Sequence, residues 1–381
     1  MRLYRSLLRR YRPESFDHTR RAFLGLGVAA GALALTGPTN AALGLPSRTH
    51  HGRRVIIAGA GLAGLACAYE LKRAGYDVQI LEARPRIGGR VLTIRNWLPG
   101  KMVEAGGELI GSNHPMWLRY AHLFGLGFRP VTDWPEENRP ILIDGRRLDD
   151  AAKRALFEDM DRILGALTRQ SRGVDAEKPW LTLDAEALDR GSFGDWLALQ
   201  RPEPLTEWVM QIELGADNGV SLAQQSLLGM MTQIKGGGLE KYWTDSEMLR
   251  CRQGNDALAA AFAGAVGGKR IHLQTQVKKI DITGNAVALV DVTGTRWQAD
   301  HVVLAIPPSV WHAVAIQPAL PATLFPQMGV NYKYLARIRK EVWAPASPEG
   351  LAEDSISETW NSVDNQSGPG LCLTGFTGGP P

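Results

Sequence analysis

The chain has 381 residues, 44% of them hydrophobic and 22% charged, so it is long enough for one large or two ordinary globular domains. Its net charge of +4 comes from the first 41 residues, and the rest of the chain carries a net charge of −1, which gives no indication of a nucleic-acid-binding surface. The three cysteines, Cys67, Cys251 and Cys372, are far apart, which favours three thiols, allows at most one disulfide and does not support a metal site.

Residues 1–41 have the three-part organisation of an export signal. Seven arginines within residues 1–21 precede the uncharged apolar run Ala22–Leu35, and Thr39-Asn40-Ala41 follows as a small-residue cleavage site. Fourteen apolar residues are too few to cross a bilayer core, which needs about 20. The sequence therefore favours a cleaved signal over a permanent membrane anchor.

The junction Thr19–Leu24, which contains Arg20 and Arg21, resembles the twin-arginine motif of bacterial Tat substrates. Such substrates are translocated in the folded state, often because a cofactor is inserted first. The resemblance implies the Tat translocase as a partner during export, and a periplasmic or secreted location.

A β-α-β unit is predicted directly after the leader. Arg53–Ala58 is typical of a buried strand, Gly59–Gly64 forms a GxGxxG turn before a helical pattern, and Val78–Leu81 is a second apolar strand. The glycines permit a tight turn, close approach to a pyrophosphate and close packing of helix on strand, and the helix N-terminus offers N–H groups to phosphates. Glu82 ends the second strand, where its carboxylate can bind ribose hydroxyls and disfavours the 2′-phosphate of NADP.

A second glycine pair favours FAD over NAD at this site. Gly88 and Gly89, followed by Arg90, offer another backbone nest to a buried pyrophosphate, for which a nicotinamide dehydrogenase has no use. The run Glu82–Arg90 resembles the E-A-R-x-R-x-G-G-R signature of the flavin-containing amine oxidase superfamily. The resemblance covers residues 53 to about 379 and implies FAD as the cofactor.

The same resemblance implies which residues contact FAD. Arg84 and Arg90 would line its phosphate and flavin side, the segment Glu104–Glu108 would approach the flavin ring, and the backbone around Val277 would hold the adenine side. The predicted cofactor-binding residues are Gly59, Gly61, Leu62, Ala63, Gly64, Glu82, Ala83, Arg84, Gly88, Gly89, Arg90, Gly106, Gly107, Glu108 and Val277.

The middle of the chain differs in pattern from the nucleotide-binding segments. Amphipathic stretches at Ala151–Thr168 and Leu205–Gly215 predict a helical lobe. The segment Lys235–Trp243 resembles a stretch of bacterial family members and is either a wall of the substrate cavity or an ordinary glycine loop. From residue 252 the pattern predicts a helix over Leu258–Val266 and then further strands up to Pro307-Pro308.

The predicted fold class is α/β. A Rossmann-like FAD-binding domain is built from two separate segments, 52–111 and 250–308, and an α+β substrate domain with a helical lobe is formed by residues 112–249 and 309–381. The N-terminal segment 1–41 is the predicted signal peptide.

Lys333 is the one residue predicted to be catalytic. By resemblance, a lysine at this place holds a water near flavin N5 and assists reoxidation by oxygen; the alternative is a surface lysine beside Arg337, Arg339 and Lys340. No other side chain is required for the reductive half, because a neutral amine can give hydride from its α-carbon to the flavin. The expected products are an imine, which hydrolyses to a carbonyl compound and ammonia, and hydrogen peroxide formed from O2.

The predicted substrate class depends on the lack of an arginine at one place in the sequence. L-amino acid oxidases usually present an arginine for the substrate carboxylate shortly after the segment matching Glu104–Gly107, and here none occurs before Arg119. This favours an amine, although Arg119 or Arg252 leaves an L-amino acid oxidase or a tryptophan 2-monooxygenase-like enzyme open. A desaturase or protoporphyrinogen oxidase-type enzyme is a weaker alternative, because it shares the nucleotide fingerprint. Lys333 and the stretch that resembles bacterial amine oxidases count against it. Neither covalent flavin attachment nor oligomeric state is indicated.

The sequence ends with the motif Gly375-Phe376-Thr377-Gly378-Gly379 and two prolines. In the family this strand belongs to the substrate domain, and a closing segment with a Gly-Glu turn and a helix directed at the flavin follows it. We therefore expect a fragment of a complete enzyme or, from a different class, a non-catalytic remnant of the FAD fold. In either case this chain alone should bind FAD weakly.

Overall fold

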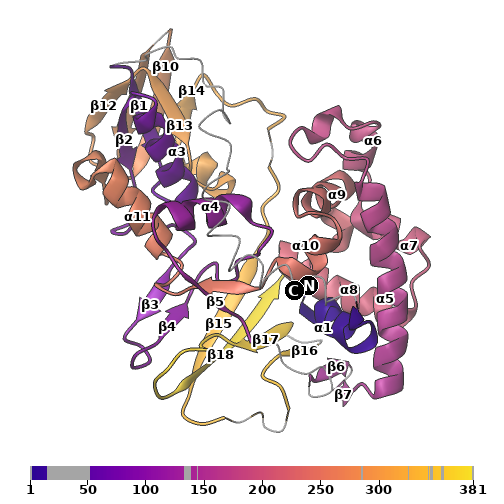
Figure 1. Ribbon diagram of the computed structural model, residues 1–381. Helices are drawn as coiled ribbons and strands as arrows, with labels where there is room; N and C mark the ends of the chain where they lie inside the picture. The colour runs from indigo at the N-terminus through magenta and orange to yellow at the C-terminus, as the bar shows by residue number, and fades with distance from the viewer. Residues whose placement is uncertain are drawn as a thin grey trace, which may run out of the picture.

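The computed structural model describes residues 2–14, 52–132, 139–143, 145–284, 286–324, 326–341, 343, 346–352 and 356–379. Figure 1 shows three regions: a sheet-and-helix region carrying β1 and α3, a helical lobe around α5, and a sheet containing β15 to β18. The predicted mixed α/β class is confirmed. The twin-arginine junction, the apolar run and the cleavage site at Thr39–Ala41 lie outside the described residues.

A four-stranded parallel sheet has the order β13-β1-β2-β9. Its central strand β1 is apolar because both of its faces are covered, as is usual for parallel sheets. Val55 and Ile57 pack against the helices α3 and α11, whereas Ile56 and Ala58 pack against a second sheet. The elements are β1 (Arg54–Ala58), α3 (Leu62–Arg73), β2 (Asp77–Leu81), α11 (Ala257–Val266), β9 (Ile271–His272) and β13 (His301–Leu304).

The second sheet has the order β12-β11-β10-β14 and covers the parallel sheet on the side away from the helices. β14 pairs in parallel with β10, although it follows the domain boundary predicted at residue 308. The chain therefore leaves this region later than the sequence indicated. The strands are β10 (Val277–Thr283), β11 (Ala286–Asp291), β12 (Arg296–Ala299) and β14 (Ala315–Gln317), and the 3-10 helix η5 (Pro308–Ala313) precedes β14.

The helical lobe is organised around the long helix α5, which Asp149 caps by accepting a hydrogen bond from the Ala152 N–H at 2.8 Å. The helices predicted over 151–168 and 205–215 lie within α5 and α8, which confirms both. The helices between residues 115 and 245 are α4 (Pro115–Leu123), α5 (Asp150–Ser171), α6 (Ala185–Arg190), α7 (Phe193–Leu199), α8 (Pro204–Asn218), α9 (Leu227–Gly236) and α10 (Glu240–Asp245), with 3-10 helices at Pro179–Leu181 and Leu222–Gln224. A further 3-10 helix, Gly268–Arg270, follows α11 in the nucleotide-binding region.

Helix α1 (Arg2–Tyr11) lies inside this lobe, although its residues belong to the predicted leader. Leu3 and Leu7 are fully buried in the same apolar cluster as Leu156 and Met160 of α5. Figure 1 shows α1 between α5 and the ends of strands β16 and β17. The first ten described residues are therefore part of the folded core.

A six-stranded sheet of order β15-β18-β17-β16-β6-β7 combines chain segments almost two hundred residues apart. β6 pairs in parallel with β16, so residues 141–147 complete the sheet formed by residues 331–378. The sequence assigned both segments to the substrate domain but did not indicate that they share a sheet. Its strands are β6 (Ile141–Ile143), β7 (Arg146–Arg147), β15 (Asn331–Ile338), β16 (Gly350–Ala352), β17 (Glu358–Asn361) and β18 (Leu371–Gly378), and the remaining strands pair as β3 (Thr93–Arg95) with β4 (Met102–Glu104) and β5 (Phe128–Pro130) with β8 (Leu249–Cys251).

The cysteines are free thiols, with Cys251 and Cys372 buried and Cys67 partly buried. Among the residues that the structure describes, no helix combines the length and apolarity needed to cross a membrane.

Candidate functional site

A cavity of about 510 Å³ lies where β1 and β2 end, at the carboxyl edge of the parallel sheet. In open α/β sheets this edge is the usual place for a ligand. Most of the predicted cofactor-binding residues line it: Gly59, Gly61, Leu62, Ala63, Glu82, Ala83, Arg84, Gly88, Gly89, Arg90 and Val277. Gly64, Gly106, Gly107 and Glu108 lie outside its lining.

The backbone in and beneath the lining of this cavity is packed too closely to admit side chains at two glycines. A Cβ atom on Gly59, which has φ +110°, would lie 2.7 Å from the Ala305 carbonyl oxygen, and one on Gly64 would lie 2.0 Å from the Gly59 oxygen. The two glycine runs touch, since the Gly88 N–H donates to the Ala60 carbonyl at 2.9 Å. Together they form a bare cradle at the N-terminus of α3, where N–H groups lack intrahelical partners.

Glu82 ties the two sides of the cradle together. Its Oε2 accepts from the Ala60 N–H at 2.7 Å and its Oε1 from the Arg84 N–H at 2.8 Å. A carboxylate offers about four lone-pair sites, so acceptor capacity remains for ribose hydroxyls. The cradle, the helix N-terminus and this carboxylate fit a dinucleotide whose pyrophosphate lies over the glycines.

The predicted flavin-facing segment packs directly on the wall of the cavity. The Gly107 N–H donates to the Arg90 carbonyl at 3.0 Å, and a Cβ on Gly106 would lie 2.1 Å from the same oxygen. Only glycine therefore allows this segment to follow Arg90 so closely. The segment extends the cavity wall toward β15.

Lys333 of β15 contacts the predicted flavin-facing segment Glu104–Glu108. Its Nζ donates to the carbonyl oxygens of Glu104 at 2.8 Å and Gly106 at 3.1 Å, and to Oε2 of Glu108 at 2.5 Å. The side chain is 12% exposed, so the alternative of a surface lysine is wrong. The structure thus brings together a predicted catalytic residue and a predicted cofactor-facing segment that are more than two hundred residues apart.

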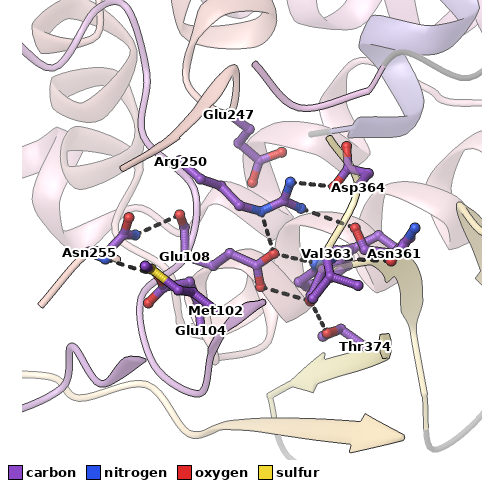
Figure 2. Close-up of polar contacts among 12 residues, drawn as sticks. Met102, Glu104, Glu108, Glu247, Arg250, Asn255, Asn361, Val363, Asp364 and Thr374 are labelled. Atoms are coloured by element: carbon purple, nitrogen blue, oxygen red, sulfur yellow. Dashed lines mark hydrogen bonds and ion pairs between the residues drawn. The ribbon is translucent and has the colours of Figure 1, made fainter. Parts of the chain in front are cut away.

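Glu108 is the centre of a buried polar network that the sequence did not reveal (Figure 2). Arg250 of β8 donates from Nε to Glu108 Oε1 at 2.8 Å and from Nη1 to Asp364 at 2.5 Å, and its Nη2 donates to the Asn361 carbonyl at 3.2 Å. The Trp360 indole N–H donates to the same Oε1 at 3.0 Å. Each charged group is paired, as burial requires.

The two glutamates of the segment have opposite pKa shifts. Burial alone would raise the pKa of Glu108, but Lys333 and Arg250 outweigh it and lower the pKa to about 2. Burial raises the pKa of Glu104 to about 7, although the Asn255 N–H and the Thr93 hydroxyl donate to it at 2.9 and 2.8 Å. Glu108 is therefore a fixed anion at neutral pH, and Glu104 titrates near neutrality.

Two arginines considered for a substrate carboxylate lie elsewhere. Arg252 donates to the Phe128 carbonyl at 2.6 Å, and Arg119 stacks over the Tyr120 ring at 5.9 Å. Arg250, Asp364 and Trp360 were missed, because no motif marks them. One signal existed: Arg250 is a single charge between the apolar Leu249 and Cys251, in a strand whose three residues are all buried.

A second cavity, of about 630 Å³, lies between the helical lobe and the loop before α4. Gly236, Gly237, Tyr242 and Trp243 of the predicted wall segment line it. Arg5, His114, Asp217 and Glu247 supply its charged and titratable groups. Among the described residues no group of three or more His, Cys, Asp or Glu side chains is placed to hold a metal ion.

Fold and site together define a class: an α/β protein with a glycine cradle for a dinucleotide, in which the six-stranded sheet brings a partly buried lysine to the segment that packs on the cradle wall. The chain belongs to the family of flavin-containing amine oxidoreductases, whose model matches residues 62–381. Membership of this family implies a flavin cofactor.

Curated relatives are similar to the chain in sequence, and a solved structure is similar to it in fold. The chain is 29% identical over 341 residues to a Mycobacterium tuberculosis protein named as a flavin-containing monoamine oxidase, covering 84% of this chain and 73% of the relative. It is 27% identical over 360 residues to the putrescine oxidase of Kocuria rosea, covering 87% and 74%. The structure of cyclohexylamine oxidase from Brevibacterium oxydans superposes with a TM-score of 0.74 at 24% identity, covering 86% of this chain and 75% of that one.

Proposed function

We propose that the chain is an FAD-dependent amine oxidase that converts an amine, O2 and water into a carbonyl compound, ammonia and hydrogen peroxide. The observation that carries the proposal is the placement of Lys333, whose ammonium is held by three oxygens of the segment that packs on the wall of the glycine-lined cavity. When bound, FAD would accept hydride from the amine α-carbon and pass the electrons to O2.

The residues of the chain have separate tasks in this reaction. The cradle around Gly59 and Gly89 and the carboxylate of Glu82 would bind the dinucleotide, with Arg84 and Arg90 beside its phosphates. Lys333, whose three N–H groups donate to Glu104, Gly106 and Glu108, would supply positive charge where oxygen is reduced, and it would hold a water there only by releasing one of these acceptors. Because Glu108 stays ionised, it keeps the ammonium of Lys333 in place rather than exchanging protons with substrate.

An amine without a carboxylate is the favoured substrate class. Arg250 is the buried arginine that shares Glu108 with Lys333, and Glu108, Asp364 and the Asn361 carbonyl already occupy its guanidinium. A relative from Synechocystis is named L-amino acid dehydrogenase, at 23% identity over 355 residues, so amino-acid oxidation is the second candidate. Within the part of the chain that the structure describes, no feature of the site favours a tryptophan 2-monooxygenase-like reaction.

The visible spectrum of the purified chain tests the proposal. We expect a flavin spectrum that bleaches when benzylamine or putrescine is added without oxygen and returns when air is admitted. Bleaching by L-amino acids alone would favour the second candidate. A flavin that none of these substrates reduces would support the non-catalytic alternative.

We further propose that the protein is exported by the Tat system to the periplasm or beyond. The support is the order of twin arginines, apolar run and small-residue site in residues 19–41. Replacing both Arg20 and Arg21 by Lys keeps the charge and should leave the protein in the cytoplasmic fraction. Unchanged export of this variant would contradict the proposal.

A further inference from the structure

The predicted flavin-facing segment Glu104–Glu108 is held by a side chain that the proposed mechanism does not use. Nδ2 of Asn255 donates to the carbonyl oxygens of Gly107 at 3.0 Å and Glu108 at 2.7 Å (Figure 2). Lys333 binds two further carbonyl oxygens of the segment. Two side chains therefore hold four of the segment's carbonyl oxygens.

The amide of Asn255 has no donor left for a ligand. The residue is 3% exposed, and its Oδ1 accepts from the Cys251 N–H at 3.0 Å. An asparagine amide has two N–H donors, and the segment takes both of them. Rotation of the amide would turn its oxygen toward two carbonyl oxygens, so the contacts fix its orientation. Asn255 does not line the 510 Å³ cavity, and it acts on the cofactor site through the segment.

The turn that carries Asn255 is fixed against β3. Gly254 has φ +90°, and a Cβ atom there would lie 2.7 Å from Thr93 Cγ2. The Asp256 N–H donates to the Thr93 hydroxyl at 3.2 Å, and its carboxylate accepts from Nη2 of Arg95 at 2.6 Å. Asn255 therefore holds the segment from a support that cannot easily follow it.

Asn255 and Lys333 belong to different parts of the molecule. Lys333 is on β15 of the six-stranded sheet. Asn255 comes just before α11, which shares an apolar cluster with α3, the helix of the glycine cradle. The backbone N–H of Asn255 also donates to Oε1 of Glu104 at 2.9 Å. Asn255 thus fixes the segment relative to the cradle, and Lys333 fixes it relative to the sheet.

We propose that Asn255 is a positioning residue for the cofactor: by binding the carbonyl oxygens of Gly107 and Glu108, it sets the backbone face that the segment offers to a flavin. The inference rests on FAD binding in the proposed function and adds a residue that acts from behind the segment. A buried carbonyl oxygen that loses its donor is destabilised, so without Asn255 the segment shifts to find another.

Hydrogen–deuterium exchange of the cofactor-free chain tests the positioning without flavin. Asn255→Asp keeps the shape of the side chain but replaces its two N–H donors by an acceptor that repels the carbonyl oxygens. The Ala105 N–H donates to Leu92 at 2.8 Å, and the Gly107 N–H donates to Arg90 at 3.0 Å. We expect both amides to exchange at least tenfold faster than in the parent, because the segment opens locally. The amides of α3 should exchange at the parent's rate.

Titration with FAD tests the consequence for the cofactor. N255D should bind FAD at least tenfold more weakly than the parent. The visible circular dichroism of its bound flavin should also differ from the parent's, because the segment presents a rearranged backbone. A purely structural loss would leave this spectrum unchanged.

The matched control is Gln327→Glu. The exposed amide of Gln327 also donates to a backbone carbonyl, that of Gln224 at 2.9 Å, on a loop outside both the segment and the cavity lining. Q327E should match the parent in amide exchange, in FAD affinity and in the flavin spectrum.

Asn255→Leu covers the case in which N255D does not fold, which far-ultraviolet circular dichroism would reveal. Leucine has the same branched shape, no charge and no donor. N255L should therefore loosen the segment and weaken FAD binding in the same direction as N255D.

Segment amides that exchange at the parent's rate in the Asn255 variants would overturn the proposal. Faster exchange along the whole chain, α3 included, would make Asn255 a general structural residue and refute the positioning role. A loosened segment with unchanged FAD affinity would refute the link to the cofactor. A loosened segment in N255D, together with a parent flavin that no amine reduces, would instead refute the oxidase function and leave the positioning role intact.

Discussion

Glu108 carries one negative charge that two cations share. Lys333 and Arg250 lie on different sheets, and both approach its carboxylate, with Trp360 completing the set. Charge-assisted hydrogen bonds of this kind are short and hold both partners in one geometry. The position of the Lys333 ammonium is therefore set from the far side of the site, by β8 and β17.

Replacement of Lys333 by Met should slow reoxidation of reduced flavin by oxygen about 100-fold, because a preorganised positive charge is lost where negative charge develops. Stopped-flow measurement of reoxidation checks this. Lys340→Met, an exposed lysine just after the same strand, is the control and should leave the rate unchanged. A K333M rate equal to that of the parent would remove Lys333 from the mechanism.

Gly64 and Gly264 form a matched pair of helical glycines. A methyl group on Gly64 would lie 2.0 Å from the Gly59 carbonyl oxygen, whereas one on Gly264 meets nothing within 4 Å. G64A should lower stability by about 1–3 kcal/mol and reduce flavin content. G264A should raise stability by up to ~1 kcal/mol, because alanine favours helix. Urea unfolding measures the stability of both variants, and flavin absorbance measures their flavin content. Equal stability and equal flavin content in G64A and G264A would contradict a tightly packed cradle.

At the scale of elements, β4 ends in a carboxyl group whose charge opposes folding. The pKa of Glu104 rises from 4.5 to about 7 because the group is buried. Its contribution to stability is therefore fully present below about pH 4.5 and is lost as pH rises through 7. The resulting loss in the free energy of unfolding is of the order of 3 kcal/mol.

Glu104→Gln should shrink the fall in stability between pH 5 and pH 8. Glu358 titrates in the same window with a pKa raised to about 8, so the comparison is between the slopes of variant and parent rather than the parent's slope alone. Urea midpoints at both pH values provide the measurement. Parallel pH profiles for the two proteins would show that Glu104 does not titrate as its burial requires.

Local patterns predicted the elements whose signals lie within a few dozen residues. The strand β1, the helix α3 and the strand β2 follow from an apolar run, a glycine turn and a helical repeat, and the structure has all three. The pairing of β6 with β16 was not predictable, because short strands carry no record of partners two hundred residues away. α1 was interpreted through its arginines, although Leu3, Tyr4, Leu7 and Leu8 follow the i, i+3, i+4 spacing of a buried helix.

The candidate site, like the fold, was predictable only where its residues belong to one contiguous motif. Residues of the glycine cradle belong to a contiguous motif and were named from the sequence, and most of them line the first cavity. Arg250 and Asp364 act through contacts between distant segments, and a single sequence gives no signal for such pairs. Lys333 was found only through the family resemblance, and its burial emerged from the fold.

At the scale of the whole molecule, β15 forms one edge of the six-stranded sheet within the described residues. Tyr332 is 56% exposed and Tyr334 is 53% exposed on this edge. Apolar edge strands invite pairing with other chains unless they are covered or charged. Arg337 is exposed on the second half of the same strand, so we expect the chain to self-associate through the first half of β15, around Tyr332 and Tyr334.

Tyr334→Lys should reduce this association, since a charge on an edge strand opposes pairing. Static light scattering across a concentration series measures it. Trp180→Lys is the control, because Trp180 is 70% exposed in the 3-10 helix Pro179–Leu181, away from the sheet. Equal effects of the two substitutions would indicate general solubility rather than association at the edge.

The buried position of α1 has a consequence for the proposed export signal. Leu3 and Leu7 share an apolar cluster with Leu156 and Met160, so cleavage after Ala41 would remove side chains that the folded helical lobe packs around. The precursor and the cleaved protein would then differ in the packing of this lobe, and the two forms should differ in stability as well as in location.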